Sequence, residues 1–267
     1  WKMPLSSALF LMSGKNMRSP ILSLLSTQDV LTELRTIINC NIKKEMNMLK
    51  DGEKGAILQR DKETYAIAPH IPCGVVKPET LRKLADAADK YGCAALKITS
   101  AARIALVGLK EEDVDNAWQD LGLSPGAAVG VCVRSIKACP GTTFCRIGQQ
   151  DSLGVGMQLD EKFHGMELPG KMKIGVSGCP NQCAETCIKD IALVGKKNGW
   201  TVMAGGSGAG KPRLADVVAE DLDTDQALAL VDTIVQYFKD NAKKNERMGK
   251  MMDRLGVPEF CSAVCGQ

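Results

Sequence analysis

Two pairs of closely spaced cysteines constrain this chain more than any other feature. Cys139 and Cys145 are separated by five residues, and Cys179 and Cys183 are separated by three. Proline and glycine follow or flank both pairs, and these residues allow the tight backbone turns that bring several thiolates to one point. Four converging thiolates suit a [4Fe-4S] cluster, so these four cysteines are the predicted metal ligands.

Two other interpretations of the cysteines remain open on this reasoning. Structural zinc is a rival, although it usually takes shorter, repeated C-x2-C pairs. Free cysteines can also be small apolar residues of the core. The chain has 11 cysteines but only two histidines, His70 and His164, which argues against a histidine-rich metal site. An odd, high cysteine count without signal-peptide architecture indicates metal or redox chemistry, and we expect a cytoplasmic protein.

Composition excludes several partners. The net charge of +3 is no polybasic signature for nucleic acid, and the 4% aromatic content argues against a base-stacking surface. The apolar stretch near the start of the chain is too short to cross a membrane. We therefore expect neither a nucleic-acid partner nor a membrane partner. A length of 267 residues allows one large domain or two small ones.

The chain is expected to have an α+β fold. Residues 1–54 are an N-terminal extension of uncertain status, and two folded regions are expected to follow them. Met46 or Met48 is a candidate natural start, and the apolar periodicity of Thr27–Ile38 indicates a helix. In residues 55–125 the pattern predicts a strand over 57–68, or a hairpin through residues 60–62, and further strands over 95–99 and 104–107. One helix is expected to begin at Pro78 and stop at Gly92, and a second helix is expected to end at Gly122. This alternation is typical of a small ferredoxin-like fold.

Residues 126–267 are predicted to form a second α+β region. Strands are expected over 129–133 and 172–176, and Asn198-Gly199 predicts a hairpin between strands 191–194 and 200–204. Helices are expected over 151–164 and from residue 222 to about 249, with Asp223 or Thr224 as the cap of the second helix.

The cysteine segments also support a family resemblance. Cys139-Pro-Gly-Thr-Thr-Phe-Cys145, followed by Gly178-Cys179-Pro-Asn-Gln-Cys183, resembles the siroheme signature of the sulfite and nitrite reductase family. The similarity covers most of the chain from about Gly55. It implies a ferredoxin-like half-domain followed by an α+β domain that binds siroheme and a [4Fe-4S] cluster. It also implies that Cys183 bridges the cluster to the siroheme iron.

The same resemblance assigns an anion-binding set of catalytic residues. Arg134 and the K-x-K pair Lys171 and Lys173 match cationic positions of the family, and residues two apart in a strand point to one face. Arg103 matches the position of shorter, nitrite-reductase-like relatives, and we assign it to siroheme or anion contact. Cations of this kind neutralise the bound anion and the charge that grows during reduction, and lysine can supply protons.

A glycine-rich segment completes the predicted cofactor site. Gly205 to Lys211 has the spacing G-x-x-x-x-G-K of a phosphate-binding loop, but Pro212 stands where that loop needs a hydroxyl, which argues against a nucleotide. The resemblance instead implies that the segment lies against siroheme, with the backbone amides of Gly205 and Gly206 cradling a carboxylate. Lys211 and Arg213 are expected to pair with other siroheme carboxylates.

These residues favour an enzyme that reduces a small oxyanion, with six-electron reduction of sulfite to sulfide as the leading prediction. Reduction of nitrite to ammonia is the alternative, and a non-catalytic iron–sulfur or siroheme electron-transfer protein is the second. No flavin or nicotinamide motif is visible, so ferredoxin or another external donor is expected to supply the electrons. Family members with two copies of this unit build one site from both, so this single copy predicts a homodimer.

Overall fold

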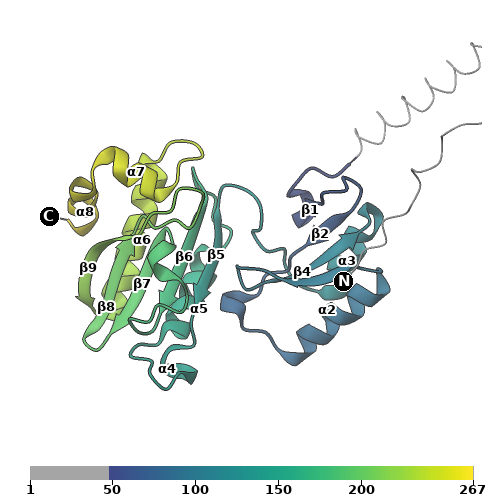
Figure 1. Ribbon diagram of the computed structural model, residues 1–267, viewed down its shortest axis with the longest axis horizontal. Helices are drawn as coiled ribbons and strands as arrows, with labels where there is room; N and C mark the ends of the chain where they lie inside the picture. Colours follow the sequence, from purple (N-terminus) through teal and green to yellow (C-terminus); the bar gives the residue numbers. More distant parts are fainter. Residues whose placement is uncertain (1–47, 267) are drawn as a thin grey trace, which may run out of the picture. The chain divides into compact units, whose positions relative to one another are not determined.

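Two β-sheets organise residues 48–266, the part of the chain that the computed structural model describes (Figure 1). The predicted helix over Thr27–Ile38 and the candidate start Met46 lie outside these residues. From Leu49 onward the chain forms one compact unit. Within residues 48–266, no helix combines the length and the hydrophobicity that a bilayer crossing requires.

The first sheet has four antiparallel strands in the order β1-β2-β4-β3. Its strands are β1 (Ala56–Leu58), β2 (Tyr65–Ile67), β3 (Ala95–Ile98) and β4 (Ile104–Leu109). The accompanying helices are α2 (Pro78–Lys90), α3 (Val114–Leu121) and the short η1 (Glu53–Gly55), η2 (Pro72–Gly74) and η3 (Glu111–Asp113). Of the two alternatives for residues 57–68, the hairpin is confirmed, because β1 pairs with β2 and Asp61 accepts hydrogen bonds from the amides of Glu63 and Thr64 in the turn.

The second sheet has five strands in chain order, β5 to β9. These are β5 (Val133–Ala138), β6 (Met172–Ser177), β7 (Ile191–Lys196), β8 (Gly199–Ala204) and β9 (Asp216–Leu222). The first three are parallel and the last two pairings are antiparallel, with the predicted hairpin between β7 and β8. The helices of this region are α4 (Gly141–Phe144), α5 (Ser152–Phe163), η4 (Thr186–Ile188), α6 (Thr224–Asn241), α7 (Met248–Leu255) and α8 (Val257–Cys265).

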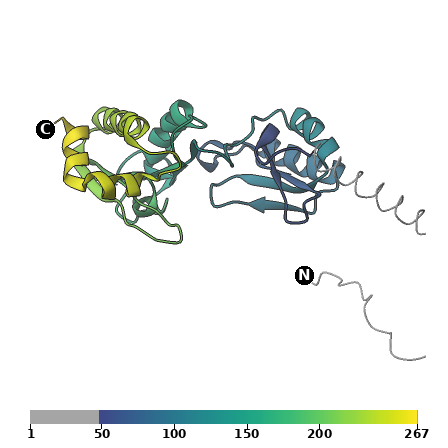
Figure 2. The same ribbon diagram turned by 90° about the horizontal axis from the view of Figure 1, so that it is seen from above.

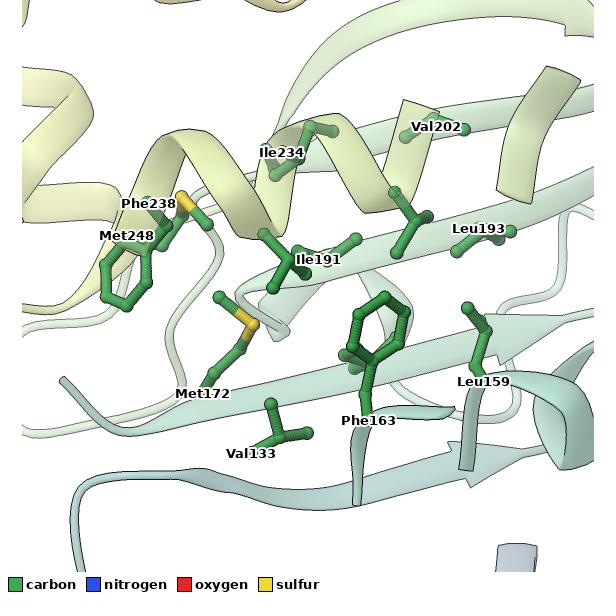
Figure 3. Close-up of a cluster of buried hydrophobic side chains, with 14 of the residues drawn as sticks. Val133, Leu159, Phe163, Met172, Ile191, Leu193, Val202, Ile234, Phe238 and Met248 are labelled. Atoms are coloured by element: carbon green, nitrogen blue, oxygen red, sulfur yellow. The ribbon is translucent and has the colours of Figure 1, made fainter. Parts of the chain in front are cut away.

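The main hydrophobic core lies between this second sheet and the helices α5 and α6, which cover one of its faces (Figure 2). Figure 3 shows Ile234 and Phe238 of α6 facing Met172 and Ile191 of the sheet. Because side chains alternate along a strand, the residues between these core positions project from the opposite face. That opposite face of β5 and β6 is available for a polar site.

Two predicted elements of the second region have wrong boundaries, and one strand was not predicted. The strand expected over 129–133 runs from Val133 to Ala138, because parallel pairing with β6 continues through polar residues. The long helix ends at Asn241 and not near 249, and α7 follows as a separate helix. Strand β9 was not predicted, since its sequence is acidic and only half apolar. The Asp223 cap is confirmed as a full capping box with Gln226.

Candidate functional site

The two cysteine pairs lie on neighbouring loops because they follow neighbouring parallel strands. Cys139 directly follows β5, and Cys179 comes two residues after β6 (Figure 1). The carboxyl ends of parallel strands meet at one edge of a sheet, which is where α/β proteins place their sites. The loops are joined by a hydrogen bond in which the Gly178 amide donates to Cys139 Sγ at 3.1 Å.

A close crossing of glycines explains how the two loops approach each other. A Cβ atom at Gly178 would lie 2.8 Å from the Cα atom of Gly141 and 2.7 Å from the Gln150 carbonyl oxygen. Gly141 also has a φ of 54°, which favours glycine. Side chains at these two positions would therefore force the cysteine loops apart.

The four cysteines supply the thiolate donors that a [4Fe-4S] cluster takes. Cys145 directly follows α4 on the first loop, and Cys183 lies in a turn of the second loop and is exposed. Within residues 48–266, no three His, Cys, Asp or Glu side chains converge as a single ion such as zinc requires. A four-iron cluster places each thiolate on a different iron, so its ligands stand farther apart. The amide bond to Cys139 Sγ also suits a cluster thiolate, whose potential depends on such bonds.

A cationic cavity of about 300 Å³ opens on the face of β5 and β6 opposite the core. Lys171 and Lys173, both predicted for the anion site, line this cavity together. Three further cations line it that sequence reasoning missed: Lys137, Lys189 and Arg247. The signal for Lys137 was present in the sequence, because it lies two residues before Cys139 and alternates with the core residue Ile136.

The positive charges that line the cavity shift the pKa values of its lysines. Burial lowers the pKa of Lys173, and the charges of Lys171, Lys189 and Arg247 lower it further. Burial and the Arg247 charge likewise lower the pKa of Lys171. A bound anion would relieve this repulsion, so the cavity has the electrostatics of an anion site.

Glu185 is the carboxylate that offsets part of this charge. It accepts a hydrogen bond from Lys189 at 3.0 Å and lies 3.3 Å from the ammonium of Lys137. The Lys189 hydrogen bond holds the pKa of Glu185 below its usual range. Glu185 therefore offsets part of the charge of Lys137 and Lys189, whereas neither Lys171 nor Lys173 forms an ion pair within residues 48–266.

Asp190 fixes two of the cavity residues in place. Its carboxylate is fully buried and accepts two hydrogen bonds from the Arg247 guanidinium, at 2.8 and 2.7 Å. It also accepts the backbone amide of Lys173 at 2.8 Å. Burial raises the pKa of Asp190, and the Arg247 charge opposes this shift. A bidentate pair of this kind orients the arginine side chain and ties it to β6.

The two predicted arginines occupy different positions. Arg134 borders a second hollow that it shares with Lys171 and Arg247, and its side chain donates to the carbonyls of Ala128 and Gly130. Arg103 is only 4% exposed and lines neither hollow. Its guanidinium instead donates to the backbone carbonyl of Arg134. The structure thus places Arg103 behind Arg134 and not at the surface of the cavity.

The glycine-rich segment only partly reaches the cavity. Gly208 and Ala209 line it, whereas Gly205 and Gly206 are buried against Arg213 and the carbonyls of Cys187 and Lys189. The Arg213 guanidinium is already engaged by Asp216, Asp253 and two backbone carbonyls. Arg213 therefore holds the loop together in this structure, and its pairing with a cofactor carboxylate stays a prediction. Lys211 is exposed on the loop.

Thiolate loops beside clustered cations are the chemistry of an iron–sulfur oxidoreductase that acts on an anion, and comparisons with known proteins identify the family. Residues 57–123 match the model of the nitrite/sulfite reductase ferredoxin-like half domain. Residues 129–267 match the nitrite and sulphite reductase 4Fe-4S domain. The chain belongs to the nitrite and sulfite reductase family, which confirms the resemblance and the predicted fold class.

Individual relatives differ in how much of their length the chain covers. It is 45% identical over 218 residues to an assimilatory-type sulfite reductase of Nitratidesulfovibrio vulgaris, covering 82% of this chain and 100% of that one. It is 36% identical to a nitrite reductase [NAD(P)H] of Bacillus subtilis, covering 86% of this chain but 27% of the relative.

Solved structures share the fold at low sequence identity. Dissimilatory sulfite reductase I has a TM-score of 0.68 at 14% identity, covering 76% of this chain and 69% of that one. The Mycobacterium tuberculosis NirA protein has a TM-score of 0.67 at 18% identity, covering 75% of this chain and 39% of that one. At these identities the likeness establishes the fold alone.

Proposed function

We propose that this chain is a siroheme-dependent reductase that converts sulfite to sulfide with six electrons. The observation that carries the proposal is the cavity in which Lys171, Lys173 and Arg247 stand together on the sheet face that leads to the cysteine loops. A plain electron carrier has no use for such a cation set. An enzyme that binds an oxyanion next to an iron–sulfur cluster needs such cations to stabilise the bound charge.

The donor sets fit both cofactors. Cys139, Cys145, Cys179 and Cys183 would hold the cluster, with Cys183 as the thiolate shared with siroheme iron. Siroheme carries many carboxylates, and Lys137, Lys189 and the exposed Lys211 are cations suited to them. When bound, siroheme supplies the iron that takes the anion and the cluster supplies electrons singly.

The protein's own side chains would bind the anion and move protons. Arg134, Lys171 and Lys173 orient the oxyanion and balance the charge that accumulates on it. Arg247, held by Asp190, adds a fixed charge to the same site. The lowered pKa of Lys173 makes its ammonium a better proton donor than an ordinary lysine, which suits the removal of oxygen as water.

Comparison with relatives favours sulfite over nitrite. The sulfite reductase of Nitratidesulfovibrio vulgaris matches along its whole length, whereas the nitrite reductase of Bacillus subtilis is a much longer protein. The test is an optical spectrum of anaerobically purified protein with iron, acid-labile sulfide and tetrapyrrole assays, followed by steady-state rates with both anions. Siroheme bands that shift with sulfite, and faster sulfite turnover, are expected. Faster nitrite turnover at equal concentration would transfer the assignment to nitrite.

The lowered lysine pKa values predict a pH dependence of anion binding. Lys171 and Lys173 bind an anion only when protonated, so affinity is present at neutral pH and is lost as pH rises through their lowered pKa values. The loss should begin below the usual lysine value of about 10.4. A titration with nitrite, which does not itself titrate in this range, measures the effect. In Lys173→Arg the loss should move to higher pH, and an unchanged profile would exclude Lys173 from the anion site.

We also propose the remaining partners. An external donor such as ferredoxin would deliver electrons, and a reducing compartment such as the cytoplasm would keep the four ligand thiols reduced. A homodimer is supported by β3, a sheet-edge strand on which Leu96 and Ile98 are exposed. Light scattering of an active preparation is expected to give twice the chain mass of 28.7 kDa. The mass of a single chain would rule the dimer out.

A further inference from the structure

The loop that carries Cys145 exposes two large apolar side chains that the proposed anion chemistry does not use. Phe144 is 79% exposed, more than any other large apolar side chain in residues 48–266, and Ile147 is 52% exposed. They lie on either side of Cys145, one of the four predicted cluster ligands. Isolated apolar side chains are common on surfaces, whereas a group of them marks a place where another molecule binds.

The backbone beneath these two side chains is fixed by hydrogen bonds. The Cys145 amide donates to the Gly141 carbonyl at 2.8 Å, and the Gly148 amide donates to the Cys145 carbonyl at 3.0 Å. The Gln149 amide donates to the Gly178 carbonyl of the second cysteine loop at 2.7 Å. The two apolar side chains are therefore presented on a preorganised loop, which lowers the entropy cost of binding a partner.

Two exposed cations lie beside this apolar pair. Arg146 directly follows Cys145, is exposed, and forms no ion pair within residues 48–266. Lys197 is exposed in the turn between β7 and β8, and it likewise has no ion-pair partner among these residues. Gln150 joins this hairpin to the cysteine loop, because its side-chain amide donates to the Lys196 carbonyl at 2.8 Å. The cluster patch consists of Phe144, Arg146, Ile147 and Lys197.

The carboxylates next to the cluster patch are already engaged. Asp151 accepts the Gly154 amide at 2.9 Å and the Thr143 hydroxyl at 3.1 Å. Glu220 forms an ion pair with Lys196. The cluster patch therefore combines apolar side chains with positive charges that no neighbouring carboxylate neutralises. Such a surface is complementary to a partner with an acidic face.

We propose that the cluster patch is the docking surface for the electron donor, and that this donor is a small acidic protein of the ferredoxin class. The proposal rests on the proposed function, in which an external donor reduces the [4Fe-4S] cluster. One electron leaves the reduced centre of the donor and enters the oxidised cluster, no covalent bond changes, and six such transfers complete the proposed reaction.

The position of the cluster patch suits electron entry. Cys145 lies between Phe144 and Arg146, so a donor seated there comes next to a cluster thiolate. Each ligand thiolate sits on a different iron of a four-iron cluster, and Cys183 is the predicted bridge to siroheme. A donor at Cys145 therefore approaches an iron other than the one that faces siroheme. Interfaces between redox partners are small, below about 1,200 Å² in total, so four side chains are enough to form the centre of one.

The first test is calorimetric titration of the cofactor-loaded protein with an acidic bacterial ferredoxin, without any anion substrate. Phe144→Ala should raise the Kd about tenfold or more, as truncation of an aromatic anchor at an interface does. Arg146→Glu and Lys197→Glu should each weaken binding and reduce its dependence on salt, because they remove attractive charges. The matched controls are Leu81→Ala and Lys239→Glu, which change an exposed apolar and an exposed basic residue elsewhere and should leave the Kd unchanged.

The second test compares two electron donors in steady-state turnover. With the ferredoxin, Phe144→Ala and Arg146→Glu should raise the KM for the donor about tenfold. With reduced methyl viologen, a small dye that needs no protein docking surface, both variants should turn over like the wild type. Iron content and cluster absorbance should also be unchanged, because neither side chain is a predicted ligand. If a substitution next to Cys145 loses the cluster, Lys197→Glu tests the same surface from the neighbouring hairpin.

Three results would overturn the proposal. The first is a wild-type Kd and donor KM in both Phe144→Ala and Lys197→Glu. The second is an equal loss of turnover with ferredoxin and methyl viologen, which would place the damage in the cluster. The third is a change of oligomeric mass by light scattering in Phe144→Ala, because the patch would then be a contact between copies of the chain.

Failure of the proposed function would give a different pattern. Ferredoxin binding and reduction of the cluster by ferredoxin are both measured without an anion. A protein that binds ferredoxin through the cluster patch and takes up its electrons, but reduces neither sulfite nor nitrite, would support the docking surface and refute the proposed reaction.

Discussion

Replacing Lys173 with alanine is expected to lower kcat/KM for the anion by about 10²-fold or more, the usual cost of losing one preorganised charge at a reacting group. Lys173 is half-buried at the centre of the cation cluster, and its backbone amide is fixed by Asp190. Its side chain lines the cavity. Cluster absorbance and iron content should remain at wild-type levels, because the cysteine loops lie beyond the far end of β6.

Two further variants make this result specific. Lys162→Ala removes an exposed lysine that pairs with Asp232 at the surface, and it should leave the kinetics unchanged. Lys173→Arg keeps the positive charge but changes the donor geometry, so it should recover anion binding better than turnover. Wild-type turnover in Lys173→Ala would sink the catalytic assignment and favour the alternative of a non-catalytic electron-transfer protein.

Local sequence patterns predicted helix ends and turns correctly where a few adjacent residues determine the structure. Gly122 ends α3 with a φ of 61°, and Asn198-Gly199 forms the β7–β8 hairpin, because both depend on a few adjacent residues. The family resemblance singled out Lys171 and Lys173, and the strand period then placed both on one face. The part of β5 after Val133 was missed because polar residues that face a cavity look like loop residues in a sequence.

Contacts between distant segments account for what the sequence could not show. Arg247 reaches the cavity only through Asp190, which lies 57 residues earlier in the chain. Arg103 and Arg213 are typical anion-binding residues in sequence, but in the structure their guanidinium groups donate to carbonyls and carboxylates of other segments. No period or spacing encodes such pairings, and they decide which cations face a ligand.

Replacing Cys183 with serine is expected to have the largest effect of all, lowering kcat by more than the 10- to 100-fold that loss of an outer-shell partner costs a metal site. Serine is nearly isosteric, but its hard, protonated oxygen replaces a soft thiolate on iron. Because Cys183 is exposed in a turn, the substitution should leave the free energy of unfolding of the cofactor-free chain unchanged. Iron, acid-labile sulfide and the sulfite-dependent shift of the siroheme bands should all decrease together.

The chain offers matched controls for this substitution, because its other thiols differ in position. Cys265 is equally exposed but lies on α8, where its thiol contacts the Val218 carbonyl, so Cys265→Ser should keep full iron content and turnover. Cys187 is the critical comparison, because it lies in η4, only four residues after Cys183. If Cys187→Ser lost iron and turnover while Cys183→Ser kept both, the bridging ligand would be Cys187. The prediction that Cys179 and Cys183 are the second pair of cluster ligands would then be wrong.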